Sequence, residues 1–377
     1  MISNPPYGRD WEIDEDEVKA EAELGFKGRF EAGLPRKSDG QFLFIQHMIS
    51  KMKTNDKSKI AVITNGSPLF TGDAGSGESE IRKWIIENDY LEALIALPTD
   101  LFFNTSIGTY IWVLTNRKSE VRKGKVQLID ARQEYVKRKK PLGKKRYNIT
   151  DSSISKIVNS YVNFTCNDNV KIFDKEYFGY TKIIVQRPMQ LNYRVTPERL
   201  ENLYSYNQFK KLAESKNKNS EKKRLEEIEG KKQQDAIKEA LLTIGDELYT
   251  DWDSFEIKVK QALNSFDLKP VFIKNIIEKL SKHDETAEYV TDKKGKPRAD
   301  SNLRSSEKIP LVRNIDDYFK EEVLKYHPDA WYDSKKNKIG YQINFTQYFY
   351  IFEPPRSIED IESDIVKLTA KIQKLIE

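Results

Sequence analysis

The sequence predicts an open α/β sheet followed by a mainly helical C-terminal region. Four short apolar runs lie within the first 130 residues, and segments with helical periodicity precede and separate them. Strands and helices that alternate along a chain are typical of open sheets covered by helices. Long, polar helical patterns begin near residue 196. Because 377 residues exceed what one hydrophobic core usually serves, we expect more than one globular part.

The predicted strands are β-branched or aromatic segments bounded by Asn, Gly, Pro or charged residues. They comprise residues 59–64, 91–97, 110–115 and 125–130. Apolar residues recur at helical spacing from Phe42 to Met52, behind a possible Ser38 or Asp39 cap, and residues 80–88 predict a second helix. We therefore place an α/β domain at residues 1–195.

The rest of the sequence divides into three predicted segments. Residues 196–250 predict a polar helical arm, because they contain a long run without apolar side chains. Residues 251–356 predict a small helical and β region, with a solvent loop at 284–308 and a strand or hairpin at 338–351. Residues 357–377 predict an amphipathic helix.

The predicted C-terminal helix carries apolar residues at spacings of three and four, as in a coiled-coil seam. These residues are Ile358, Ile361, Ile365, Leu368, Ile372 and Leu375. Such a short seam is not stable alone in water. We therefore expect Ile361, Ile365, Leu368 and Ile372 to bind a partner, in this chain or in another.

The composition excludes several classes of protein. The chain is 38% hydrophobic and 33% charged, and it has no apolar run near the roughly 20 residues that span a bilayer. Its first residues contain no secretory signal, so we expect a cytoplasmic protein that does not interact with membranes. With Cys166 as its one cysteine and three scattered histidines, we expect neither an internal disulfide nor a metal site.

The strongest chemical signal is the segment Ser3-Asn4-Pro5-Pro6-Tyr7-Gly8. An amine conjugated to an aromatic ring is a poor nucleophile, because its lone pair is delocalised into the ring. The Asn4 side-chain oxygen and the Pro5 carbonyl can accept both amine hydrogens and make the nitrogen more tetrahedral. Pro5 and Pro6 keep the turn rigid, and Tyr7 offers a ring face for an extruded base. The alternative is an ordinary loop or a proline-rich ligand of another domain.

Further motifs follow in order along the chain. They are Gly66-Ser67-Pro68-Leu69-Phe70, Gly72 to Glu78, Leu97-Pro98, Phe103-Asn104-Thr105, Gly124 to Ala131, Pro328-Asp329-Ala330-Trp331 and Pro354-Pro355-Arg356. Together with the Asn-Pro-Pro-Tyr segment, they make the sequence resemble the modification subunit of type I restriction-modification systems, within the N6-adenine DNA methyltransferases. The resemblance covers most of the chain. It implies part of a Rossmann-like, S-adenosylmethionine-dependent methyltransferase sheet.

The resemblance also implies S-adenosylmethionine as the methyl donor and DNA adenine as the acceptor. The implied partners are a specificity subunit, which reads the DNA sequence, and a restriction subunit. An aromatic residue after Leu97-Pro98 would stack on the flipped adenine opposite Tyr7. Phe103 is favoured over Phe102 for this role, although either can instead be a core residue.

The start of the sequence departs from this family. Its members bind the donor with segments that precede the Asn-Pro-Pro-Tyr loop, whereas three residues precede it here. We therefore expect the chain to lack the N-terminal part of the family, to bind no S-adenosylmethionine by itself and to be inactive alone.

The glycine-rich residues 72–78 lack the Gly-Lys-Ser/Thr ending of a phosphate loop. They predict a flexible loop near the mouth of the site, or a solvent loop without a role.

A basic cluster predicts contact with the DNA backbone. It consists of Lys137, Arg138, Lys139, Lys140, Lys144, Lys145 and Arg146. Many charge runs are merely solvated, but beside a methyltransferase sheet we favour phosphate contact. Conversely, the acidic residues 14–17 would repel DNA and are expected to lie away from it.

Two other functions are compatible with the sequence. The Asn-Pro-Pro-Tyr loop also serves enzymes that methylate another planar amine, such as a protein glutamine or a ribosomal RNA guanine, but the large helical C-terminal part argues against those compact enzymes. The chain could also be a non-catalytic assembly module that docks a specificity subunit.

Overall fold

The structure, a computed structural model, describes residues 1–292, 294–352 and 354–376. It divides into two compact units. Unit 1 comprises Met1–Lys182, Pro310–Val312 and Lys338–Glu377, and unit 2 comprises Ile183–Ile309 and Arg313–Asn337. The predicted divisions at residues 195, 250 and 356 do not coincide with these units. The reason is that the chain returns to unit 1 through β14 (Lys338–Tyr341), which pairs with β9 (Gly179–Gln186).

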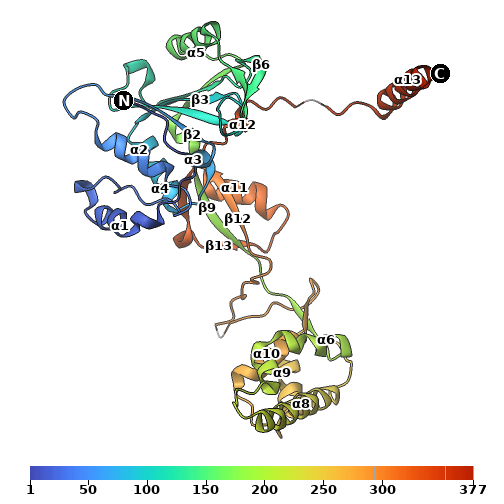
Figure 1. Ribbon diagram of the computed structural model, residues 1–377. Coiled ribbons are helices and arrows are strands. Elements are labelled where there is room, and N and C mark those ends of the chain that lie inside the picture. Colours follow the sequence, from blue (N-terminus) through green and yellow to red (C-terminus); the bar gives the residue numbers. More distant parts are fainter. Residues whose placement is uncertain (293, 353, 377) are drawn as a thin grey trace. The chain divides into compact units, whose positions relative to one another are not determined.

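A six-stranded mixed sheet lies at the centre of unit 1 (Figure 1). Its order is β1-β2-β4-β3-β5-β8, with strands at Ile2–Ser3, Lys59–Asn65, Thr109–Thr115, Leu91–Leu97, Lys125–Asp130 and Val170–Asp174, respectively. The pairs β1–β2 and β3–β5 are parallel, whereas β4 is antiparallel to both β2 and β3. Strands β1, β2, β3 and β5 therefore run in one direction and end at the same edge of the sheet. The four predicted strands and the α/β fold class are confirmed.

Helices cover both faces of this sheet (Figure 1). The helices α2 (Gln41–Ser50) and α4 (Gly77–Glu87) pack on one face, and α5 (Asp151–Asn163) packs on the other. Successive residues of β3 enter the two cores, Leu94 on the side of α2 and α4 and Ile95 on the side of α5. Burial on both faces explains why this strand is almost continuously apolar. Both helices predicted before residue 90 are confirmed.

Unit 1 contains further elements. They are α1 (Glu15–Glu23), α3 (Ser67–Phe70), the hairpin of β6 (Val136–Leu142) and β7 (Lys145–Asn148), α12 (Phe345–Tyr348) and α13 (Ile358–Ile376). The strand predicted within residues 338–351 is confirmed for β14 only. A helical turn, α12, follows it and places the Phe345 ring in the main core.

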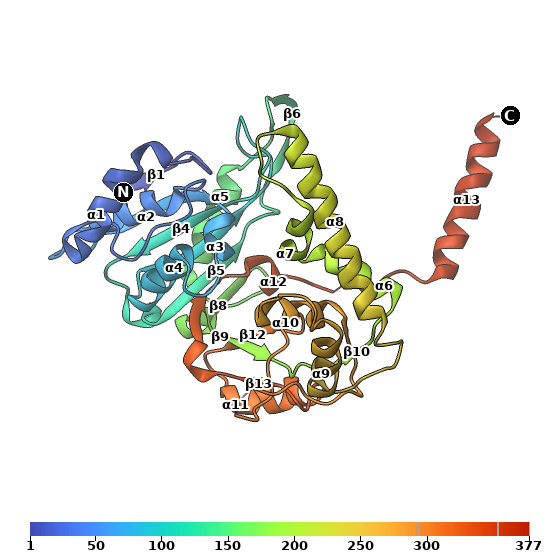
Figure 2. The ribbon, with the colours of Figure 1, turned by 90° about the horizontal axis from the view of Figure 1, so that it is seen from below.

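Unit 2 contains a cluster of helices with a core of its own (Figure 2). The helices are α6 (Pro197–Glu201), α7 (Asn207–Lys210), α8 (Ser220–Leu242), α9 (Trp252–Ala262) and α10 (Pro270–Lys279). The first half of α8 is exposed, whereas Ile237 and Leu241 in its second half are buried in the core that they share with α9 and α10. The polar pattern that predicted an arm thus describes the first half of this helix.

Short strands complete unit 2. They are β10 (Leu191–Tyr193), β11 (Ser281–His283), β12 (Ser305–Pro310) and β13 (Trp331–Tyr332), with the helical turn α11 (Ile315–Tyr318). The solvent loop predicted at residues 284–308 is wrong for Val290 and Asp300, which are buried. Main-chain bridges from this segment to Pro188 and Gln190 hold it against the unit. None of the described helices is both long enough and apolar enough to cross a membrane.

Arg82 in α4 is fully buried and ties the C-terminal strand to the first half of unit 1. Its Nε donates to the Tyr341 carbonyl at 2.7 Å, and its Nη1 donates to the Pro68 carbonyl at 2.9 Å. Its Nη2 donates to the Gly72 carbonyl at 3.4 Å and so holds the start of the glycine-rich loop. Burial lowers the pKa of Arg82 to about 10, which leaves the guanidinium charged at neutral pH. Three carbonyls thus replace the water that this charge has lost.

Replacing Arg82 with methionine is expected to lower the free energy of unfolding by about 3–5 kcal/mol, because three buried carbonyls lose their donors. Urea denaturation followed by circular dichroism measures this change. The matched control is Lys83→Met on the same helix, where a partly exposed ammonium lies 3.8 Å from Glu80. We expect this control to change stability by less than about 0.5 kcal/mol. Equal losses in the two variants would contradict the anchoring role of Arg82.

Candidate active site

The Asn-Pro-Pro-Tyr loop begins where β1 ends. The parallel register pairs Ile2 with Ala61 and Ser3 with Val62, so Asn4 is the first residue beyond the last pair. Asn4 is exposed, Pro5 is buried and Tyr7 is half-buried. Loops at the carboxyl ends of strands are the usual location of binding sites in open α/β sheets. The loop is therefore anchored by Pro5 at that edge, with the Asn4 amide accessible.

A hydrogen bond within the loop orients Asn4. The Tyr7 hydroxyl donates to Asn4 Oδ1 at 2.9 Å. Burial raises the pKa of Tyr7 to about 12, so this hydroxyl stays protonated at neutral pH and remains a donor. An amide oxygen has two lone pairs, and the bond from Tyr7 uses one of them. The other is left for a second donor.

The predicted catalytic residues line one cavity of about 440 Å³. Its lining comprises Asn4, Pro5, Pro6, Tyr7, Asn65, Phe102, Asn104, Thr105 and Ile107. This volume lies within the range of small-ligand sites. Four of these lining residues were not assigned to the site from the sequence, namely Asn65, Asn104, Thr105 and Ile107. The available signal for Asn65 was a polar side chain at the end of a predicted strand.

Phe102, rather than Phe103, reaches this cavity. Its ring lies 6.1 Å from the Tyr7 ring, measured between centroids, at an interplanar angle of 76°. Phe103 is 61% exposed and does not line the cavity. The loop after β3 turns at Asp100, which has a φ of 52°, so the direction of the two rings could not be read from strand alternation.

A buried polar network holds Asn65 in place. The Gln41 Nε2 donates to Asp39 Oδ1 at 2.8 Å and to Asn65 Oδ1 at 2.9 Å, and Gln41 Oε1 accepts from the Asn65 backbone N–H. The Ser67 backbone N–H also donates to Asn65 Oδ1, at 2.8 Å. The side-chain oxygen of Asn65 already accepts two hydrogen bonds. Its amide nitrogen is therefore the group that can donate a hydrogen bond to a ligand in the cavity.

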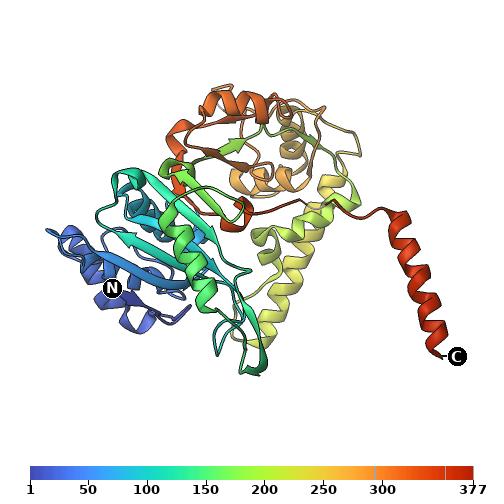
Figure 3. The ribbon, with the colours of Figure 1, turned by 90° about the horizontal axis from the view of Figure 1, so that it is seen from above.

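The seven basic residues predicted to contact DNA lie on the β6–β7 hairpin, which projects beyond the sheet (Figure 3). Arg138 and Lys145 are half-buried; the exposed members are Lys137, Lys139, Lys140, Lys144 and Arg146. Arg138 Nη1 donates to Asn148 Oδ1 at 3.0 Å. Within the described parts of the chain, no carboxylate forms an ion pair with any of the seven. Their charge is therefore available to an external anion.

The hairpin is hydrogen-bonded to the loop that carries Phe102. The backbone N–H of Lys144 donates to the Phe103 carbonyl at 2.9 Å, and that of Arg146 donates to the Asp100 carbonyl at 2.9 Å. The turn is formed by Gly143, with a φ of 60°, and a Cβ at this position would lie 2.6 Å from the Phe103 carbonyl oxygen. The basic hairpin and the aromatic wall of the cavity thus form one continuous structure.

The C-terminal helix α13 presents its seam to solvent. Ile361, Ile365, Leu368 and Ile372 are all exposed, which is unusual for four apolar side chains in a row at helical spacing. The predicted helix is confirmed, and its binding role stays a prediction.

No group of three His, Cys, Asp or Glu side chains among the described residues is placed to hold a metal ion.

Comparisons with known proteins show the family to which the chain belongs. Residues 1–193, just over half of the chain, match the family of N-6 DNA methylases. The chain is 29% identical over 200 residues to the type I restriction enzyme MjaIX methylase subunit of Methanocaldococcus jannaschii, which covers 53% of this chain and 34% of that protein. It is 42% identical over 105 residues to the HindI methylase subunit of Haemophilus influenzae, which covers 28% of this chain and 22% of that protein.

A solved methyltransferase subunit of a type I restriction-modification system from Streptococcus thermophilus is 29% identical, and the match covers 46% of this chain and 34% of that one. Its TM-score of 0.38 is too low for an argument from structural likeness. The chain spans about a third of the length of the first of these curated relatives. On the strength of the family match over residues 1–193, the chain belongs to the N-6 DNA methylase family, and its relatives include methylase subunits of type I restriction enzymes.

Proposed function

We propose that this chain provides the adenine-binding part of a modification subunit that methylates N6 of DNA adenine in a type I restriction-modification complex. The observation that carries the proposal is the cavity in which Asn4, Tyr7 and Phe102 meet at the carboxyl edge of the sheet. Family membership supports DNA methylation. The choice of adenine over cytosine rests on the description of that family, whose members methylate N-6.

Asn4 and Pro5 are the groups proposed to act on the amine. The free lone pair of Asn4 Oδ1 and the Pro5 carbonyl would accept the two amine hydrogens. Accepting both hydrogens draws the nitrogen lone pair out of conjugation with the ring and directs it at the methyl donor. The hydroxyl of Tyr7 keeps Asn4 Oδ1 facing the amine, since it donates to that oxygen at 2.9 Å. No strong general base is required, because the nitrogen becomes acidic as the methyl group arrives.

Asn65 favours a base whose amine adjoins an acceptor ring nitrogen, as in adenine and cytosine, over guanine. Its amide nitrogen would donate to N1 of adenine, which is an acceptor beside the amine. In guanine the equivalent nitrogen carries a hydrogen and would repel this donor. Flipped bases are commonly read by hydrogen bonds to the Watson–Crick edge.

Base stacking would require Phe102 to turn. Stacked bases lie about 3.4 Å apart, so a base between two parallel rings needs roughly 7 Å between the ring planes. The Tyr7 and Phe102 rings instead meet edge to face, with centroids 6.1 Å apart. We propose that the entering base displaces the Phe102 ring into a parallel orientation.

S-adenosylmethionine, when bound, would supply an electrophilic methyl group. The cavity lining contains no carboxylate that could hold a ribose, so it fits the acceptor amine and not the donor. We propose that the donor is held by other residues of the complete protein, and that this chain by itself neither binds it nor catalyses transfer.

In the complete enzyme, Asn4→Ala is expected to lower kcat at least about a hundredfold, because one acceptor of the developing charge is lost. Transfer of labelled methyl groups to DNA measures the rate, and mass spectrometry of the nucleosides identifies the expected product, N6-methyl-2′-deoxyadenosine. DNA affinity should stay nearly constant, since phosphate contacts are unaffected. The control is Asn163→Ala at the exposed end of α5. An active Asn4→Ala enzyme, or methylated cytosine as the product, would refute the proposed chemistry.

The basic hairpin is proposed to hold the DNA backbone next to the cavity. Alanine at Lys139, Lys140 and Lys144 should lower DNA affinity and reduce the slope of log affinity against log salt by up to about 0.9 for each lost phosphate contact. Fluorescence anisotropy of a labelled duplex at several salt concentrations measures both quantities. The matched control removes three exposed lysines of the helical cluster, Lys218, Lys222 and Lys223. If both triple variants lose the same affinity, net charge rather than the hairpin determines binding.

The α13 seam is proposed to dock the specificity subunit, and the restriction subunit would join the same complex. Replacing both Ile365 and Leu368 with Asp should weaken co-purification with the specificity subunit, because the substitutions place charge in the apolar seam. The far-ultraviolet circular dichroism of the chain should stay unchanged. Val366→Asp is the control, since Val366 is 68% exposed and lies outside the seam. Undiminished co-purification of the double variant would exclude this docking site.

A further inference from the structure

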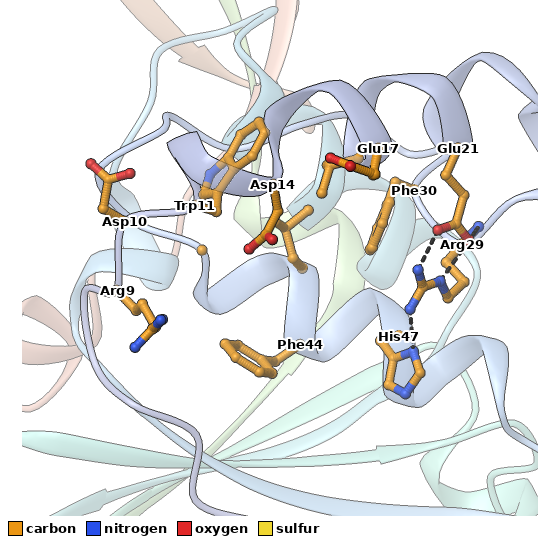
Figure 4. A pocket seen from close by; sticks show the side chains of 13 residues that line it. Arg9, Asp10, Trp11, Asp14, Glu17, Glu21, Arg29, Phe30, Phe44 and His47 are labelled. Carbon is orange, nitrogen blue, oxygen red and sulfur yellow. Dashed lines mark hydrogen bonds and ion pairs between the residues drawn. The ribbon is translucent and has the colours of Figure 1, made fainter.

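A second cavity of about 440 Å³ lies between α1 and α2 and shares no lining residue with the cavity at Asn4 (Figure 4). Its lining comprises Arg9, Asp10, Trp11, Asp14, Glu17, Val18, Glu21, Arg29, Phe30, Gly40, Leu43, Phe44 and His47. The proposed methylation chemistry uses none of these residues.

The walls of this cavity are aromatic and rigid. The Trp11 indole N–H donates to the Arg36 carbonyl at 3.0 Å, and the Trp11 backbone N–H donates to the Lys37 carbonyl at 3.1 Å. Phe30 is almost fully buried, and Phe44 remains 37% exposed at the opening. Flat aromatic faces favour apolar or planar cationic groups.

Carboxylates without cationic partners surround these walls. Asp14 is the N-cap residue of α1, yet its side chain makes no capping hydrogen bond, and it points into the space between α1 and α2 (Figure 4). Asp14 and Glu17 form no ion pair among the described residues. The nearby ammonium of Lys37 pairs instead with Glu12 and Glu15, at 3.8 and 2.5 Å.

The other charges of the cavity largely cancel. Arg29 forms an ion pair with Glu21, and its Nη1 lies 3.0 Å from His47 Nδ1. Since a guanidinium can only donate, His47 Nδ1 must accept and the imidazole is neutral. Burial and the charge of Arg29 both lower the pKa of His47, in agreement with this tautomer. Arg9 is the remaining cation, set against Asp10, Asp14 and Glu17.

We propose that this cavity is a docking pocket for an arginine side chain of a protein partner. A guanidinium can stack its plane on the exposed ring of Phe44 while its N–H groups donate to Asp14 and Glu17. A lysine ammonium is a point charge that would gain less from the aromatic walls. The acidic residues of α1 extend beyond the cavity and repel nucleic acid, so the complementary surface is a basic patch on a protein. This inference does not depend on the proposed methylation.

Binding can be measured with N-acetyl-arginine amide as the probe and the 377-residue chain as the receptor. The chain has five tryptophans, whose indole N–H signals are resolved by NMR and assigned by single Trp→Phe substitutions. We expect a saturable shift of the Trp11 indole signal alone. N-acetyl-lysine amide should bind more weakly, and N-acetyl-citrulline amide, which has the same shape without the charge, should give no saturable shift.

Matched variants distinguish binding in this cavity from a general effect of negative charge on α1. Asp14→Asn with Glu17→Gln should weaken the arginine probe at least about fivefold. Asp16→Asn with Glu23→Gln removes the same charge from the same helix, outside the cavity lining, and should leave the affinity nearly unchanged. The proposal is overturned if Trp11 does not respond, if citrulline or lysine matches arginine, or if the two double variants lose affinity equally.

Discussion

The parallel pairing of β1 with β2 is the constraint on which the candidate site depends. Its register places Ser3 opposite Val62, so the chain leaves the sheet at Asn4 while β2 continues to Asn65. Because β3 runs in the same direction, the loop with Phe102 emerges at the same edge. An amide acceptor, an amide donor and two aromatic rings thus come together from three strand ends, and a one-residue slip of β1 would turn Asn4 away from the cavity.

Charge is segregated within unit 1. The β6–β7 hairpin carries seven basic residues and is bonded through its backbone to the Phe102 loop. Helix α1 instead carries an excess of carboxylates around an aromatic cavity. A phosphate backbone is attracted to the hairpin and repelled by α1. The net charge of +5 therefore says little about partners, since the two surfaces favour opposite ones.

Sequence patterns predicted four of the six strands of the sheet, since β3, β4 and β5 are mostly buried and all four read as short apolar runs, whereas the short strand β1 and the less buried β8 were not predicted. They also placed Asn4 and Tyr7 in one candidate site by their chemical type and spacing, and both residues line the same cavity. The sequence favoured Phe103 over Phe102, whereas Phe102 lines the cavity, because the direction of the two rings depends on the turn at Asp100. Asn65 was missed because its role arises from a network with Gln41 and Asp39, which only the fold assembles.

Contacts between residues that are far apart in the sequence could not be predicted either. Arg82 and Tyr341 are far apart in sequence, and no local pattern indicates that a buried guanidinium joins them. The acidic run on α1 was predicted to avoid DNA, but its relation to Trp11 and Phe44 requires α2 to pack against it. Residues that act through one local motif were therefore predictable, and those that act through tertiary contacts were not.

The central claim is that a nucleobase enters the cavity between Tyr7 and Phe102. Photo-cross-linking tests it most directly, with a DNA strand that carries 8-azidoadenine at scattered positions and mass spectrometry of the linked peptides. A base stacked in the cavity should link to Tyr7 or Phe102, and free adenosine should compete for that link. Cross-links found only at residues outside the cavity, unaffected by adenosine, would contradict the account.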